Sequence, residues 1–329
     1  NAWVGHNFGE LMLGSSTATI IGLKEVDGSV VLNPDPLTVL TSGQEAIGIC
    51  EDDSMFHIDA EPEQWAQLDD RMWQALPPAV EKMLLMGWSS LGPLILEEID
   101  RQVAPGSTLR LLIDPNLHDL EAVRQSLNLS SQQVIIQEGQ LTDRRDVALA
   151  LDEGPYDHIM LLCEREHFDV NEADARTLLG LMLVRVALGD DIATDSIVAE
   201  VLDPSDVELG GGDSMSDFIV SQKLISLLMA QLSENPQLEA VFQEIFGSEG
   251  LILDLQPITR YVQPGSMDFA SIIRACREWG VVPIGYRTRD SAGTMVVKLN
   301  PPKGEKVDLG DDDAVIVLCA NESAAHVRP

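Results

Sequence analysis

Residues 82–114 carry the pattern of a β-α-β unit, which constrains the fold of this chain more than any other stretch. A short apolar run at residues 83–86 ends at Gly87 and is followed by an amphipathic, helix-like segment. After a Pro-Gly turn, a second apolar run at residues 109–113 ends in Asp114. This order is typical of the first unit of a doubly wound α/β sheet, which consists of a strand, a glycine turn, a helix and a second strand that ends in an acid.

The glycine pattern of this turn departs from a dinucleotide-binding fingerprint. The first and third glycines of G-x-G-x-x-G are present as Gly87 and Gly92, but Ser89 occupies the middle position, where the backbone must approach a pyrophosphate most closely. Trp88 adds bulk beside it. We therefore expect a structural turn and no bound nucleotide. The alternative is an NAD or ATP site with Asp114 on a ribose.

Helices and strands alternate through the residues that follow, as a parallel sheet requires. Helices are predicted at residues 119–127, 143–151 and 172–188, and strands at residues 133–137, 158–163 and 195–201. The pattern predicts an α/β fold with a Rossmann-like, doubly wound parallel sheet.

Two further helical patterns come after this sheet. Residues 217–232 are apolar on nearly every side, and after a break a second pattern spans residues 237–246 and is closed by Gly247. A helix that is apolar nearly all round is buried in a core or in a subunit interface. Because a helix-turn-helix here leaves a Rossmann-like domain, we expect the interface.

The two ends of the chain contain copies of one small β-rich unit. Residues 284–286 (Ile-Gly-Tyr) match residues 21–23 (Ile-Gly-Leu), and residues 296–301 match residues 30–34 with one insertion. Both matches end in an Asn-Pro pair, and a glycine stands ten positions after each asparagine. We therefore predict a repeat whose two copies enclose the doubly wound domain.

The composition of the chain restricts the partners and the type of protein that we expect. The 21 Lys and Arg residues against 54 Asp and Glu residues give a formal charge of −33, which argues against nucleic acid or anionic lipid as a direct partner. No apolar run approaches the ~20 residues that a transmembrane helix needs, and we find no signal-peptide pattern.

Four widely spaced cysteines predict reduced core thiols in a cytoplasmic protein: Cys50, Cys163, Cys276 and Cys319.

Motifs spread over nearly the whole chain are shared with one family. They lie at residues 21–23, 32–34, 51–53, 84–88, 104–107, 173–176, 178–185, 200–204, 216–221, 237–246, 284–287 and 300–302. Together they resemble the cytoplasmic RCK region of the CASTOR/POLLUX ion channels.

The resemblance implies the end of a first RCK domain followed by a complete second one. The implied parts are a C-lobe of the first RCK domain (1–58), an acidic linker (59–79), a Rossmann-like N-lobe (80–208), a crossover helix-turn-helix (209–248) and a second C-lobe (249–329). Both C-lobes are expected to be small and β-rich. The resemblance also implies a fragment, with pore helices and a first Rossmann lobe upstream of Asn1.

Acidic residues follow two consecutive strands of the predicted sheet. The carboxyl ends of parallel strands form the crevice where ligands of doubly wound sheets bind. Calcium prefers several oxygens, including carboxylates brought from different loops. Related RCK domains bind calcium with acids in corresponding regions, which resemble Glu172, Asp174 and Glu200 here. With Asp203 from the loop after the second strand, these residues form the calcium site that we predict. The alternative is a solvated acidic rim.

The resemblance implies a gating-ring module of a cation channel that senses a ligand, calcium by this interpretation, and couples it to pore opening. Its partners would be further copies of the subunit in a tetrameric ring and the pore domain. The segment itself would be soluble, at the cytoplasmic side of a membrane. No nucleophile motif is present and no histidine pair has ligand spacing, so we expect no enzyme. The alternatives are a nucleotide-dependent Rossmann oxidoreductase and a regulatory subunit of a separate ion transporter.

Overall fold

The computed structural model describes residues 3–59, 80–189, 197–205, 218–247, 251–290 and 293–320. The chain divides into two compact units. One unit is Pro77–Pro236, and the other combines Asn1–Leu76 with Gln237–Pro329. Most of the predicted acidic linker lies outside the described residues, as do residues 209–217 of the predicted crossover.

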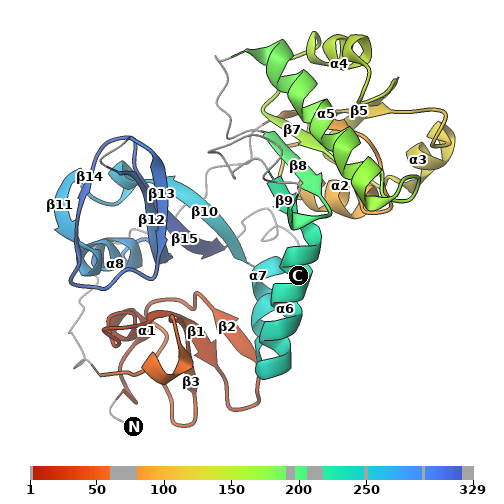
Figure 1. Ribbon diagram of the computed structural model, residues 1–329. Helices are drawn as coiled ribbons and strands as arrows, with labels where there is room; N and C mark the ends of the chain where they lie inside the picture. The colour runs from red at the N-terminus through yellow and green to blue at the C-terminus, as the bar shows by residue number, and fades with distance from the viewer. Residues whose placement is uncertain are drawn as a thin grey trace. The chain divides into compact units, whose positions relative to one another are not determined.

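The unit Pro77–Pro236 contains the predicted doubly wound sheet (Figure 1). Six strands run parallel in the order β6-β5-β4-β7-β8-β9. The strands are β4 (Lys82–Met86), β5 (Ser107–Ile113), β6 (Gln132–Glu138), β7 (His158–Leu161), β8 (Ile197–Val201) and β9 (Phe218–Val220). The helices are α2 (Gly92–Asp100), α3 (Leu120–Ser126), α4 (Arg144–Leu151), α5 (Val170–Leu188) and α6 (Ser221–Glu234).

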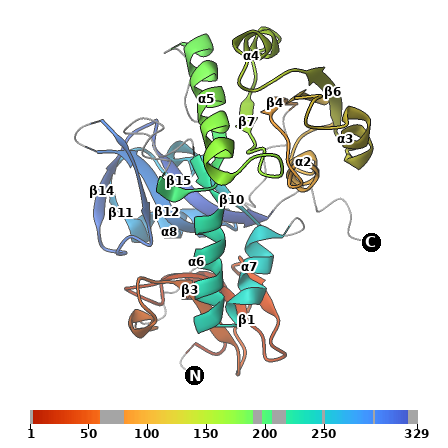
Figure 2. The same ribbon diagram turned by 45° about the vertical axis from the view of Figure 1, so that its right-hand side comes forward.

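Alternation along β4 shows how the two faces of this sheet are covered (Figure 2). Met83 and Leu85 belong to a core that includes Leu96 of α2. Leu84 and Met86 belong to a separate core with α4 and α5. Because successive side chains of a strand point to opposite faces, two apolar layers form on one strand with no polar face left over. This explains why the strand reads as a continuous apolar run.

The sheet edge corrects one sequence prediction. Phe218–Val220 is the parallel strand β9, paired with β8, and α6 begins only at Ser221. Its three residues are aromatic or β-branched, which favours a strand when a ladder is available. Apolar composition alone could not distinguish this short strand from the first turn of the helix that follows.

The second unit contains both small β lobes. The first lobe has α1 (Phe8–Leu11), β1 (Thr19–Lys24), β2 (Val30–Leu32) and β3 (Glu45–Ile49), with strand order β2-β1-β3. The second has β10 (Leu251–Pro257), β11 (Gly265–Asp268), α8 (Phe269–Arg277), β12 (Val282–Arg289), β13 (Met295–Leu299), β14 (Lys306–Leu309) and β15 (Ala314–Ala320), in sheets β10-β15-β12-β13 and β11-β14. Helix α7 (Leu238–Phe246) packs against β2 and β10.

The structure confirms the predicted repeat. Each copy has a register shift just before its matched glycine, at Gly22 in β1 and at Gly285 in β12. A Cβ atom on either glycine would lie 2.5 Å or less from a carbonyl oxygen of the paired strand. Asn33 and Asn300 both have positive φ, 43° and 44°. Asparagine tolerates this left-handed conformation better than other non-glycine residues, which explains the shared Asn-Pro signal.

The two copies pack against each other through reciprocal hydrogen bonds. Asn33 Nδ2 donates to Gly280 O (3.1 Å), and Asn300 Nδ2 donates to Thr17 O (3.0 Å). Thr17 and Gly280 each stand five residues before the matched glycine of their copy. The equivalent donors therefore reach equivalent acceptors, as in a two-fold dimer. One apolar core spans both copies.

Within the described residues, no helix combines the length and apolarity needed to cross a bilayer. The four cysteines are free thiols. Cys163, Cys276 and Cys319 are buried, as predicted, but Cys50 is only partly buried and does not belong to a core.

We predict that Asn33→Ala lowers the free energy of unfolding by about 2 kcal/mol, half from the lost hydrogen bond and half from alanine at positive φ. Asn300→Ala should lower it by at least as much, because Asn300 Oδ1 also accepts a hydrogen bond from Thr19 Oγ1 (2.8 Å). Glycine at either position suits the backbone and should recover about half of the loss. Urea unfolding of the chain measures both. Asn128→Ala, at an exposed position, is the control and should change stability by less than ~0.5 kcal/mol. A large loss at one asparagine and none at the other would contradict the reciprocal packing.

Candidate functional site

The candidate site lies at the carboxyl edge of the parallel sheet, where β4, β5, β7 and β8 end. The loop between β7 and α5 reaches several neighbouring elements there. The five residues at positions 164–168 contact four side chains of neighbouring elements, with Arg176 shared by the first and the last of them. This loop positions the acidic residues that the sequence singles out.

The glycines of the β4–α2 turn are explained by packing. Gly87 has a φ of +77°, and a Cβ atom there would lie 2.4 Å from Leu162 O. A Cβ atom on Gly92 would lie 2.7 Å from the ring of Trp88, which is itself buried. Both positions thus require glycine without any ligand. The partial fingerprint is consistent with the structural turn that we expect.

A carboxylate of the chain itself occupies both donors of one residue in this turn, Ser90. Glu166 accepts hydrogen bonds from Ser90 N (3.0 Å) and Ser90 Oγ (2.6 Å), just before α2 begins. Partial burial acts to raise the pKa of Glu166, but these hydrogen bonds outweigh it and hold the pKa below its ordinary value. In a dinucleotide-binding turn the start of the helix holds the pyrophosphate. Here Glu166 supplies the negative charge at that position.

Asp174 is one of the predicted calcium ligands, and its carboxylate is fully buried. It accepts hydrogen bonds from Leu202 N and Asp203 N, both at 2.8 Å. It also accepts a long contact from Cys163 Sγ at 3.6 Å. The side chain therefore ties α5 to the loop after β8. These bonds satisfy backbone donors that would otherwise be costly to bury.

Glu200, at the end of β8, is the second buried acid of the predicted set. Its carboxylate pairs with Arg165 and accepts a hydrogen bond from Cys163 N (3.2 Å). Burial raises the pKa of Glu200, and the Arg165 guanidinium opposes this shift. A comparable pair lies nearby, where Arg176 Nε donates to Glu164 (2.9 Å). Burial likewise raises the pKa of Glu164.

The other two predicted ligands lie closer to solvent. Glu172 is exposed on the first turn of α5. Asp203 accepts hydrogen bonds from Ser205, which lower the pKa of its carboxyl group. The structure thus brings Asp174, Glu200 and the backbone of Asp203 to one edge but not Glu172. In the part of the chain that is described, no three acidic, histidine or cysteine side chains converge as a metal site. The calcium site stays a prediction.

A histidine pair at the same edge has no signal in the sequence. His118 follows β5 and His167 follows β7, 49 positions later, yet their rings pack edge to face with centroids 4.6 Å apart. His118 Nε2 is buried and has no hydrogen-bond partner among the described residues. Burial and the neighbouring His167 lower the pKa of His118, and Glu166 and Asp114 oppose the shift. Only the sheet topology could have revealed this contact.

Comparison with known proteins identifies relatives of the chain. No protein-family model matches it. The chain is 25% identical to the probable ion channel POLLUX of Arabidopsis thaliana over 96% of its own length. It is 26% identical to the ion channel CASTOR of Lotus japonicus over 91% of its length. This chain is similar to the CASTOR and POLLUX ion channels over nearly its whole length. It spans 42% and 39% of these two relatives, respectively.

A solved structure supports the fold. The human SLO3 gating ring superposes on 97% of this chain with a TM-score of 0.66, at 14% sequence identity, and 65% of that chain is covered. The predicted RCK-like α/β fold is therefore confirmed, as is the resemblance to the CASTOR/POLLUX family.

We predict that His118→Gln flattens the pH dependence of stability between about pH 7 and pH 5. Because the pKa of His118 is lowered in the folded chain, the unfolded chain binds more protons in this range. The contribution of His118 to the free energy of unfolding is therefore complete above pH ~6.5 and is lost as the pH falls. Urea unfolding at a series of pH values measures the difference between variant and parent.

Glu164 and Glu200 have raised pKa values, so their contribution to stability decreases as the pH rises. Both residues are present in the parent and in the H118Q variant, so this effect cancels in the comparison. His57→Gln, at an exposed position, serves as the control. An H118Q profile parallel to the parent's would show that the pair does not titrate as described.

Proposed function

We propose that this chain is a cytoplasmic regulatory module of a cation channel, in which RCK-type lobes assemble with other copies and couple ligand binding to a pore. The similarity to ion channels over 91–98% of the chain carries this proposal. The gating-ring fold supports it independently. The assignment of the lobes to a first and a second RCK domain belongs to the same proposal.

An oxidoreductase is the weaker candidate. In the turn that would hold a dinucleotide, both donors of Ser90 are bonded to Glu166, and the glycines pack against protein. We therefore expect neither nucleotide binding nor enzymatic activity. The similarity to channels also favours a channel module over a regulatory subunit of a separate transporter.

Calcium is the ligand that we propose for the carboxyl edge. Calcium takes six to eight oxygen ligands and favours carboxylates. Glu200 and Asp203 lie at the end of β8, and each is linked to the β7–α5 region, one through Arg165 and one through Asp174. A cation that takes Glu200 from Arg165 would release that arginine and with it the β7–α5 loop. Such an exchange gives the two conformations different affinities, which regulation requires.

Assembly would use apolar helix surfaces. No residue of α6 is buried, and Leu224, Ile225, Leu227 and Met229 are each more than half exposed. A second stripe runs along α5, where four exposed apolar residues recur at helical spacing: Ala175, Leu179, Met182 and Val186. Exposed apolar stripes of this kind mark protein contacts. We propose that both helices pack on other RCK-like lobes.

We predict that Leu224→Glu combined with Leu228→Glu shifts the chain to smaller species in sedimentation velocity, because two carboxylates would have to be buried in the contact. Gln222→Glu with Gln231→Glu adds the same charge at exposed positions of the same helix and should leave assembly unchanged. A parent chain that sediments as a monomer at all concentrations would contradict the proposed role of α6.

We predict that calcium raises the thermal midpoint of the chain, with a stabilisation of about 2.7 kcal/mol at a free concentration of ~100 Kd. Magnesium should act less, because it gives up its waters reluctantly. The double variant Glu200→Gln/Asp203→Asn should lose most of the shift.

The control Glu51→Gln/Asp152→Asn removes the same charge at exposed positions elsewhere and should keep the calcium shift. The measurement needs ~0.15 M salt, which screens non-specific attraction to a −33 chain. A full shift in the E200Q/D203N protein would exclude a site at the end of β8.

A further inference from the structure

A pocket lies at the edge of the parallel sheet opposite the acidic loops. Its volume is about 310 Å³, at the lower end of the range for small-molecule sites. It lies where β4, β7 and β8 begin, beside the end of α2 and the residues just after it. The lining residues are Glu81, Met83, Ile99, Gln102, Val103, His158, Ile159, Met160 and Val198.

Strand alternation explains why the pocket is apolar and incompletely filled. Ile159 and Ile197 belong to the core on the α4 and α5 side, so their neighbours Met160 and Val198 face the α2 side. Met160 and Val198 pair in register, and both are only partly buried. The end of α2 reaches this face with Val103. Met160 and Val198 thus present apolar surface that a ligand could still cover, beside Val103, which is already buried.

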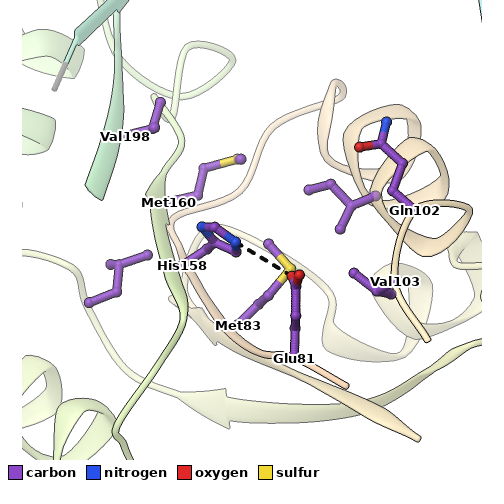
Figure 3. A pocket seen from close by; sticks show the side chains of 9 residues that line it. Glu81, Met83, Gln102, Val103, His158, Met160 and Val198 are labelled. Carbon is purple, nitrogen blue, oxygen red and sulfur yellow. Dashed lines mark ion pairs between the residues drawn. The ribbon is translucent and has the colours of Figure 1, made fainter. Parts of the chain in front are cut away.

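One carboxylate stands at this apolar pocket. The backbone of Glu81 is fixed, because its N–H donates to Ser107 Oγ (3.0 Å) and its carbonyl accepts from Thr108 N (2.8 Å). Its carboxylate lies 3.5 Å from His158 Nε2 without a hydrogen bond, and the described residues offer it no other ionic partner. The His158 side chain is 53% exposed and therefore has room to move aside. Figure 3 shows this pair on the strand side, facing Gln102 and Val103.

We propose that this pocket binds a small organic cation with an apolar, aromatic body, whose ammonium group pairs with Glu81. Charge complementarity identifies the class: the field of a −33 chain concentrates cations, and Glu81 supplies a fixed partner for one. Met83 and Met160 contribute adaptable thioethers, which make favourable contacts with aromatic rings. A bare metal ion fits poorly, because six of the nine lining side chains are apolar.

This site is independent of the proposed channel function and of the carboxyl edge. It differs from the crevice where doubly wound sheets bind ligands, because it lies at the amino ends of the strands. A ligand there would contact β4, β7 and β8 from the face that α2 covers only in part.

The test uses 2-phenylethylamine as the probe, with 2-phenylethanol as its uncharged analogue. Methyl NMR of the methionine-labelled chain should show saturable shifts of Met83 and Met160, with a Kd of about 1 mM or tighter for a ligand of this size. Glu81→Gln should weaken the amine by at least about 10-fold, and the alcohol should bind the parent chain weaker by a similar factor.

Glu97→Gln removes the same charge from α2 outside the pocket and should leave the affinity unchanged. Val198→Phe fills the pocket from a partly exposed position and should abolish the methyl shifts while the thermal midpoint stays near that of the parent. Equal affinity of the amine for the parent and E81Q chains, or no saturation by ~10 mM, would overturn the proposal.

Discussion

The carboxyl edge of the sheet depends on one loop whose every charged side chain has a partner. Glu164 bonds to Arg176, Arg165 to Glu200 and Glu166 to Ser90, so the loop after β7 joins α5, β8 and the β4–α2 turn. Buried ion pairs contribute little net stability, but removing one partner leaves a costly uncompensated charge. The edge is therefore held in one arrangement because each charged side chain bonds to a partner. A ligand can change this arrangement only by replacing one of these partners.

The β unit reaches a fixed arrangement by a different route. Its two copies share an apolar core, and the orientation is set by a few directional contacts, of which Asn33 to Gly280 and Asn300 to Thr17 form a reciprocal pair. Apolar contact is non-directional and fixes no orientation. A hydrogen bond is directional, so the bonds from these two side chains fix how the copies are oriented. The repeat is visible in the sequence because both copies must keep the same glycine and asparagine for these contacts.

Local patterns predict the elements of the sheet and the repeat well, because apolar runs and glycine turns act over a few residues. Helix α5 begins at Val170, two residues before its predicted start, because Asp169 is its N-cap residue. The apolar pattern predicts a helix where β9 lies, because three apolar residues are too few to show a period. The His118–His167 contact and the Glu166–Ser90 bond could not be predicted, because they join loops that only the strand order brings together.

High acidity is a poor guide to a metal site in this chain, because several acids act as internal acceptors. Asp100 accepts hydrogen bonds from the backbone of residues 130–132, and Asp174 accepts them from residues 202 and 203. A cation that took the Asp174 carboxylate would leave two backbone donors without a partner. At Glu200 it would instead displace Arg165, whose side chain is 27% exposed and can be solvated. Of the two buried predicted ligands, Asp174 and Glu200, Glu200 is therefore the one at which a cation would compete with a partly exposed arginine and a single backbone donor, the N–H of Cys163.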